Sequence, residues 1–119
     1  MIGNKTISVI LPAYNAEKTL QKTYNEIPLD LVDHVILVDD DSTDKTYQVA
    51  QELNIEHIIK HDHNIGYGGN QKSCYQKALS IESDIIVMLH PDYQYTPKLI
   101  PAMCYLIHSG VYKVVLGSR

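Results

Sequence analysis

Residues 34–42 read HVILVDDDS, so that an apolar, β-branched run leads directly into three consecutive aspartates. A short apolar run bounded by turn residues is typical of a strand buried on both faces, as in a parallel sheet. Residues 84–92, DIIVMLHPD, repeat the pattern and also end in an acidic turn. Because open α/β sheets bind ligands at the carboxyl ends of their strands, both turns are candidates for one site. Carboxylates there can accept hydrogen bonds from a base or sugar and hold a hard cation against phosphates, which favours a nucleoside diphosphate ligand.

Length and composition restrict the class of protein. The 119 residues suffice for one domain, residues 1–119, and an apolar content of 45% allows a packed core. The net charge is −4 without a basic run, which argues against nucleic-acid binding. The two cysteines, Cys74 and Cys104, match no metal spacing and indicate a reducing compartment. With no signal pattern and no apolar run of membrane-spanning length, we expect a cytoplasmic protein.

Strand and helix patterns alternate along the chain, which predicts a right-handed, mostly parallel α/β sheet. The expected strands are residues 6–11, 34–38, 55–60, 84–89 and 113–116, and the expected helices are residues 16–27, 43–53 and 71–82, with a further helix beginning at Thr96-Pro97. Asn15 is the expected N-cap of the first helix, and Ser42 or Thr43 that of the second. Pro101 requires an irregular first turn in the last helix. The chain therefore ends directly after its fifth expected strand.

Two loop features remain open at this point. Gly66-Tyr67-Gly68-Gly69 lacks the spacing of a dinucleotide fingerprint, and it is either a phosphate cradle or a flexible turn into a helix. His61 and His63 could form a two-histidine metal pair, or they belong to a solvated loop. His34, His57 and His108 match no motif.

Five motifs follow one another in a recognisable order: residues 7–15 (ISVILPAYN), 38–44 (VDDDSTD), 64–70 (NIGYGGN), His90-Pro91-Asp92 and Gly117-Ser118-Arg119. Together they resemble the family-two inverting glycosyltransferases of the GT-A fold, and in particular the dolichyl-phosphate mannosyltransferase-like branch. The resemblance covers almost the whole chain. It implies a Rossmann-like GT-A sheet that is truncated after the fifth strand, so that the chain would be the nucleotide-sugar-binding part of the enzyme.

The resemblance also implies roles for residues at the strand ends. Pro12, Ala13 and Tyr14 would line the base pocket, and Asp40 would accept a hydrogen bond from the base. The remaining donor-site residues implied by the resemblance are Asp39, Asp41, Gly68 and His90. The alternative for residues 39–44 is a helix-capping turn.

A divalent cation is implied as well. The family's metal motif usually has two aspartates flanking one residue, and here His90 stands in place of the first while Asp92 matches the last. Asp92 would coordinate Mg²⁺ or Mn²⁺ on the diphosphate, and His90 would bind the ribose or the metal itself. The alternative is a plain Pro-Asp turn after the strand.

The implied reaction is transfer of a hexose, with inversion, from a nucleoside diphosphate sugar to an acceptor such as a polyprenyl phosphate or a glycan. In the family the general base follows the GSR-like segment, so we expect it beyond Arg119, and we expect this chain alone to bind donor without transferring sugar. A full-length parent would then work at the inner membrane face. An exposed sheet edge would favour self-association.

Two other classes of protein remain as alternatives. One is a non-catalytic nucleotide-binding or assembly module. The other is a receiver-like signalling domain, in which residues 6–11 would be a surplus strand ahead of the acidic pair.

Overall fold

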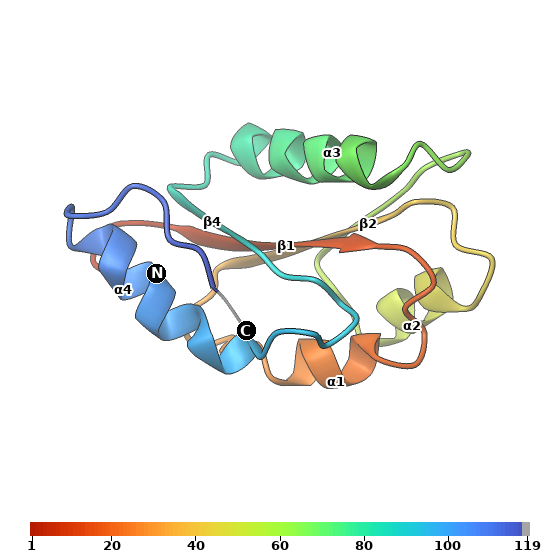
Figure 1. Ribbon diagram of the computed structural model, residues 1–119, viewed down its shortest axis with the longest axis horizontal. Helices are drawn as coiled ribbons and strands as arrows, with labels where there is room; N and C mark the ends of the chain where they lie inside the picture. The colour runs from red at the N-terminus through yellow and green to blue at the C-terminus, as the bar shows by residue number, and fades with distance from the viewer. Residues whose placement is uncertain (118–119) are drawn as a thin grey trace.

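The computed structural model describes residues 1–117 and consists of a parallel sheet between two layers of helices (Figure 1). Within these residues the sheet has four strands in the order β3-β2-β1-β4, and all neighbouring pairs are parallel. The strands are β1 (Ile7–Ala13), β2 (His34–Asp39), β3 (His57–Lys60) and β4 (Ile85–Met88). The helices are α1 (Leu20–Asn25), α2 (Thr46–Glu52), α3 (Tyr67–Ser80), the 3₁₀ helix η1 (Pro97–Leu99) and α4 (Ile100–His108). The predicted α/β class with a parallel sheet is confirmed.

The side chains of the sheet alternate between two hydrophobic clusters, because successive residues of a strand point to opposite faces. Helix α3 covers one face, and α1, α2 and α4 cover the other (Figure 1). Ile10, Ile36 and Val38 pack against Cys74 and Ala78 of α3. The larger cluster on the opposite face includes Leu11 and Leu37 from the sheet together with Leu20, Ala50 and Ile100. Both central strands are therefore buried on both faces, as their apolar runs predict.

Two helices begin later than predicted because local side chains bind elsewhere. Asn15 has a positive φ of 51°, and its Oδ1 accepts the Thr43 N–H at 2.9 Å, so it caps no helix. Helix α1 accordingly begins at Leu20 rather than Ala16, with Thr19 as N-cap. Helix α2 begins at Thr46 without a side-chain cap from Ser42 or Thr43. These predicted caps are wrong.

Helix α3 begins earlier than predicted, at Tyr67, so that Gly68 and Gly69 lie in its first turn. Gly66 makes the turn into the helix with a φ of 90°. A Cβ at Gly69 would lie 2.8 Å from Ile65 Cδ1, whereas a Cβ at Gly68 would meet nothing within 4 Å. The glycines at 66 and 69 are thus needed for the turn itself, and Gly68 is not.

The end of the chain differs from the prediction. Residues 113–117 form no strand, so the expected fifth strand at 113–116 is wrong for the described residues, and β4 is an edge of the sheet there. The segment lines a hollow beside β4 and α4, but its Val114 and Leu116 are 74% and 87% exposed. Because no other described residues pack over these side chains, the segment gains little of the side-chain packing that stabilises a strand. Ser118 and Arg119 of the predicted GSR segment lie outside the described residues.

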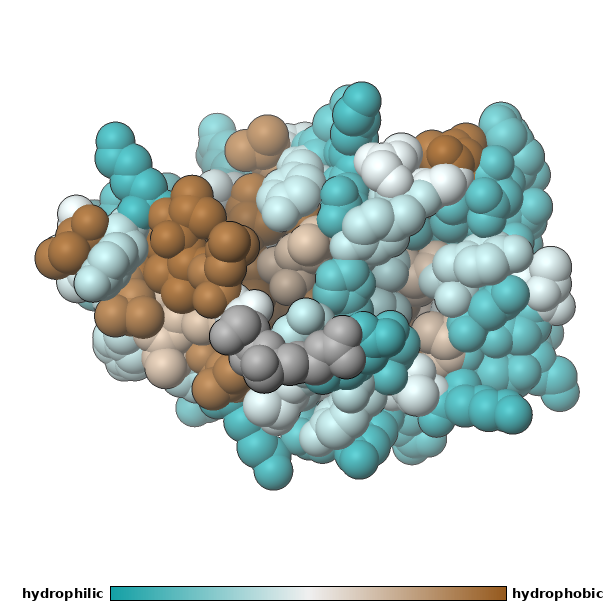
Figure 2. Space-filling model, viewed as in Figure 1, coloured by the Kyte–Doolittle hydropathy of each residue, from teal (hydrophilic) through white to brown (hydrophobic). Residues whose placement is uncertain are grey.

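Other features of this end agree with the prediction. Thr96 caps η1 by accepting the Lys98 N–H at 3.2 Å, and Pro97 follows it. Pro101 lies in the first turn of α4, where a missing N–H costs no helical hydrogen bond. Figure 2 shows hydrophobic side chains gathered beside α4 and the last residues, where Val111, Val114 and Leu116 are the most exposed. Over residues 1–117 no helix has the length and apolar character to cross a membrane. Self-association through an exposed sheet edge stays a prediction.

Candidate functional site

The segments that follow the four described strands lie at one edge of the sheet. Ala13, Asp39 and Lys60 are partners across β1, β2 and β3, so these three strands end level with one another. On the other side of β1, the Leu89 N–H donates to the Ile10 carbonyl at 3.0 Å and continues β4 toward the same edge. The residues that follow each strand therefore form a common rim.

Asp40 organises the loop between β3 and α3. Its carboxylate accepts hydrogen bonds from the Ile65 N–H at 2.9 Å, the Gly66 N–H at 3.0 Å and His61 Nδ1 at 2.8 Å. The side chain is only 3% exposed. Burial alone would raise the pKa of the Asp40 carboxyl, but the hydrogen bonds from Ile65, His61 and Gly66 outweigh it and lower that pKa. Asp40 is therefore an ionised anchor of the rim, and its predicted contact with a base stays a prediction.

Asp39 lies on the other side of the strand end and is only partly satisfied. Its Oδ1 accepts from the Ser42 N–H at 3.3 Å and from the Ser42 hydroxyl. Its Oδ2 is buried and has no hydrogen-bond partner among the described residues. A buried carboxylate oxygen without a donor is costly, so this atom is a candidate for contact with a ligand or water. Asp41 follows with a φ of 58° and is half-buried.

The turns after β1 and β2 are joined to each other. The Asn15 N–H donates to Ser42 Oγ at 2.9 Å, and the Ala16 N–H donates to Thr46 Oγ1 at 2.8 Å. Asp44 accepts the Thr46 N–H at 2.9 Å at the beginning of α2. Burial would raise the pKa of the Asp44 carboxyl, but the hydrogen bonds from Thr46 outweigh it and lower that pKa. The capping alternative thus applies to Asp44 and not to the three preceding aspartates.

The predicted base-pocket residues lie where β1 meets the rim. Pro12 and Ala13 are buried in the last part of β1, and Tyr14 follows with half of its surface exposed. Asn70 of α3, which sequence reasoning missed, donates to the carbonyls of Ala13 at 3.2 Å and Val38 at 3.1 Å. The sequence feature that could have identified Asn70 was its place in the NIGYGGN motif. Asn70 thus joins the ends of β1 and β2, and Tyr14 follows the first of these.

The turn after β4 brings His90 against Tyr67 of α3, a second residue missed from the sequence. The two rings stack with centroids 5.5 Å apart, and the Tyr67 hydroxyl lies 3.1 Å from His90 Nε2. The Pro91 carbonyl accepts from Thr19 Oγ1 at 2.7 Å and Thr23 Oγ1 at 3.2 Å, which ties this turn to α1. Asp92 is exposed, and its Oδ1 accepts the Gln94 N–H at 3.2 Å. Asp92 therefore extends into solvent from a turn that is held in place.

The donor set of His90 and Asp92 fits a Mg²⁺ or Mn²⁺ ion that is shared with phosphates. Among the described residues these two do not belong to a group of three close histidine, cysteine or carboxylate ligands. Mg²⁺ is commonly held by one or two carboxylates together with waters and substrate phosphates, so a single exposed aspartate is a sufficient protein anchor. His90 adds an imidazole, which Mn²⁺ accepts more readily than Mg²⁺.

Gly68 and the remaining histidines of the loop complete the rim. Gly68 is exposed in the first turn of α3, whose N–H groups lack intrahelical acceptors, as at any helix N-terminus. His61 Nε2 lies 2.8 Å from Ser73 Oγ, so His61 links Asp40 to α3, and His63 is exposed. The structure therefore brings Asp40 and His61 together at the β2 end, with Asp39 on the other side of that end, and brings Tyr67 against His90 at the β4 end, where Asp92 follows in the same turn.

Comparison with known proteins agrees with this geometry. The family described as Glycosyl transferase family 2 matches residues 8–119. The chain is 32% identical to the UDP-N-acetylglucosamine–dolichyl-phosphate N-acetylglucosaminyltransferase of Methanococcus voltae over 99% of its own length and 53% of that protein. It is 29% identical to the dolichol-phosphate mannosyltransferase of Pyrococcus furiosus over 95% of its length and 33% of that protein.

A solved structure shares the fold. Glucosyl-3-phosphoglycerate synthase from Mycobacterium tuberculosis, in complex with Mn²⁺ and UDP-glucose, superposes with a TM-score of 0.74 at 28% identity, covering 91% of this chain and 41% of that one. The chain thus spans about half or less of each of these relatives. The family match decides against the receiver-domain alternative. With the family match over residues 8–119 and the four-stranded sheet of residues 1–117 in agreement, the chain belongs to glycosyl transferase family 2 and has the GT-A fold.

Proposed function

We propose that this chain binds the nucleoside diphosphate sugar of a family 2 hexosyltransferase. The observation that carries the proposal is the rim itself. Asp39, the last residue of β2, has a buried carboxylate oxygen (Oδ2) without a donor among the described residues, and the exposed Asp92 follows β4, so the two lie at the ends of the strands on either side of β1. The first can accept a hydrogen bond from the base or ribose, and the second can hold a cation on the diphosphate. Tyr14 supplies an exposed ring on which a base can stack.

The chain's own residues bind and orient the donor in this proposal. A bound Mg²⁺ or Mn²⁺ would supply charge stabilisation to the departing nucleoside diphosphate. The first turn of α3, at Gly68, offers N–H groups to phosphate oxygens. The acceptor is a polyprenyl phosphate by analogy with the two dolichyl-phosphate enzymes, and the general base, expected beyond Arg119, lies outside the described residues.

Donor binding is the direct test, and transfer is not, because the chain spans only part of its relatives. Isothermal titration calorimetry with UDP-, GDP- and dTDP-sugars, with and without Mn²⁺, should show binding of one nucleotide class that is strengthened by the metal. Asp39→Asn and Asp92→Asn each remove a charge-assisted contact and should weaken binding about tenfold or more. Asp30→Asn, at an exposed position in the turn after α1, is the matched control and should bind as the unsubstituted chain does.

The outcomes separate the alternatives. Nucleotide binding that both rim variants keep in full would place the ligand elsewhere and overturn the proposal. Binding without metal dependence that only Asp39→Asn weakens would favour a non-catalytic nucleotide-binding module.

A further inference from the structure

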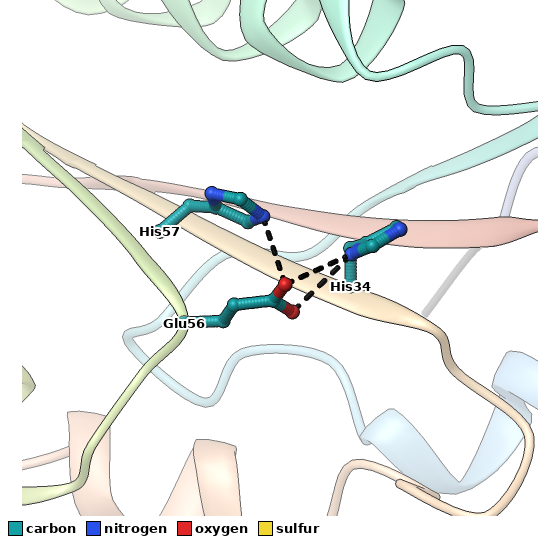
Figure 3. A group of neighbouring side chains, drawn as sticks. All are labelled: His34, Glu56 and His57. Atoms are coloured by element: carbon teal, nitrogen blue, oxygen red, sulfur yellow. Dashed lines mark hydrogen bonds and ion pairs between the residues drawn. The ribbon is translucent and has the colours of Figure 1, made fainter.

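Three metal-ligand side chains meet at the amino ends of β2 and β3, away from the rim (Figure 3). His34 is the first residue of β2, His57 is the first residue of β3, and Glu56 precedes it. The sheet register pairs Ile36 with His57, and His34 lies two residues before Ile36. Because side chains alternate along a strand, both imidazoles lie on the face that α3 covers. Their ring centroids are 5.6 Å apart.

The separations between the Glu56 carboxylate and the two imidazoles are those expected between neighbouring metal ligands. Glu56 Oε2 lies 3.2 Å from His34 Nδ1, and Glu56 Oε1 lies 3.2 Å from His57 Nε2. One ligand atom from each of the three residues lies within 4.8 Å of the others. In a tetrahedral zinc site with bonds of about 2.0–2.1 Å, neighbouring ligand atoms are about 3.3 Å apart. Two of the three ligand pairs therefore already have the separation that a tetrahedral site requires.

The hydrogen bonding of His57 gives an independent reason to look for a ligand. Its Nε2 is buried and makes no hydrogen bond among the described residues, although a carboxylate oxygen lies 3.2 Å away. The direction is therefore wrong for a hydrogen bond, and a buried ring nitrogen is left unsatisfied, which is costly. A cation between the ring and the carboxylate would satisfy it. Glu56 is 52% exposed and leaves the site open to solvent.

We propose that His34 Nδ1, His57 Nε2 and the Glu56 carboxylate bind a zinc-class divalent cation, with water at the open position. Two imidazoles and one carboxylate suit Zn²⁺ far better than Mg²⁺. The site is distinct from the cation expected at the rim, because β2 extends about 16 Å from His34 to Asp39 at about 3.3 Å per residue. A bound ion would join the edge strand β3 to β2.

Zinc titration against a chromophoric chelator tests the proposal. Asp92→Asn serves as the parent protein, so that the exposed carboxylate expected to hold the cation at the rim is removed. The parent should bind one equivalent of Zn²⁺, and adding His34→Ala, His57→Ala or Glu56→Gln should weaken binding at least about tenfold. Adding His63→Ala, which removes an exposed histidine, is the matched control and should leave the affinity unchanged. Equal affinity in all four variants, or no bound equivalent in the parent, would overturn the proposal.

A second measurement does not depend on whether the variants fold. In the unsubstituted chain, one equivalent of Zn²⁺ should shift the imidazole NMR resonances of His34 and His57, and the same concentration of Mg²⁺ should not. Zinc shifts confined to the other histidines, such as His61 and His90, would contradict the assignment.

Discussion

Replacing Asp40 with asparagine tests whether this residue builds the rim. The carboxylate accepts three hydrogen bonds in a nearly dry environment, from Ile65, Gly66 and His61. The asparagine side chain has the same shape but one acceptor oxygen, and its NH₂ group would face a donor. Asp40→Asn should therefore release the loop of residues 61–66 from the end of β2.

The expected loss in free energy of unfolding follows from the hydrogen bonds that Asp40→Asn removes. A hydrogen bond to a charged group contributes about 1.5–3 kcal/mol to the free energy of unfolding. With two of the three bonds lost or weakened, the free energy of unfolding should fall by about 3–5 kcal/mol. That is a large share of the roughly 5–15 kcal/mol that stabilises a typical domain.

Urea unfolding followed by circular dichroism measures this change. Asp62→Asn lies in the same loop at an exposed position and is the matched control, with an expected change within about 0.5 kcal/mol. A loss for Asp40→Asn below about 1 kcal/mol would refute the anchoring role.

The pH dependence of the free energy of unfolding is an independent test of the role of Asp40. The pKa of the Asp40 carboxyl is lowered in the folded state, because the hydrogen bonds outweigh burial. The contribution of the Asp40 carboxylate to stability is therefore complete above the pKa of about 3.9 in the unfolded chain, and it is lost as the pH falls through the lower pKa of the folded chain. The difference in free energy of unfolding between the unsubstituted chain and Asp40→Asn should stay constant from pH 6 to 8 and become smaller below about pH 4. A difference that widens on acidification would contradict this assignment.

Two further predictions concern α3. Asn70→Ala removes the side-chain donor to the buried carbonyls of Ala13 and Val38, although the Ala13 carbonyl still accepts the Asp40 N–H at 2.9 Å, and should lower the free energy of unfolding by about 1–3 kcal/mol. Asn25→Ala, at an exposed position of α1, should change the free energy of unfolding little, and equal effects of the two substitutions in urea unfolding would argue against the bridging role. Burial raises the pKa of the Cys74 thiol to about 12, so a thiol reagent at pH 8 should label Cys74 only after the chain unfolds. Peptide mapping of the labelled protein measures this, and rapid labelling of Cys74 in the folded chain would contradict its burial.

The strands and their ends were predictable because the relevant signals are local. The runs ending at Val38 and Leu89 are apolar on both faces, and only a strand covered on both sides accommodates such a pattern. The acidic turns then had to lie at the carboxyl edge of a parallel sheet. The family resemblance added the roles of Asp40 in contact with the base and of Asp92 in metal binding, which the strand pattern alone did not contain and which stay predictions.

The helix starts and the fifth strand were not predictable, because they depend on partners distant in sequence. Asn15 has the side chain of an N-cap but bonds to Thr43, 28 residues away. Residues 113–116 have the composition of a strand, but Val114 and Leu116 remain exposed. His61 and Tyr67 carried no pattern that distinguishes a rim contact from a loop residue.

The three consecutive aspartates have a structural explanation in the alternation of β2. Val38 packs against α3, so Asp40, two residues on, faces the loop that leads into α3 and holds it. Leu37 packs on the opposite face, so Asp39 faces the Ser42 turn and holds that turn with one oxygen. Asp41 has a positive φ, which aspartate tolerates better than most residues. One strand end therefore anchors a turn on each face of the sheet, and of the aspartates at this end it is Asp39 that retains a buried carboxylate oxygen without a partner among the described residues. If the proposed function is correct, Asp40 stabilises the rim while Asp39 would contact the nucleotide, so Asp40→Asn should act mainly on the free energy of unfolding and Asp39→Asn mainly on nucleotide affinity.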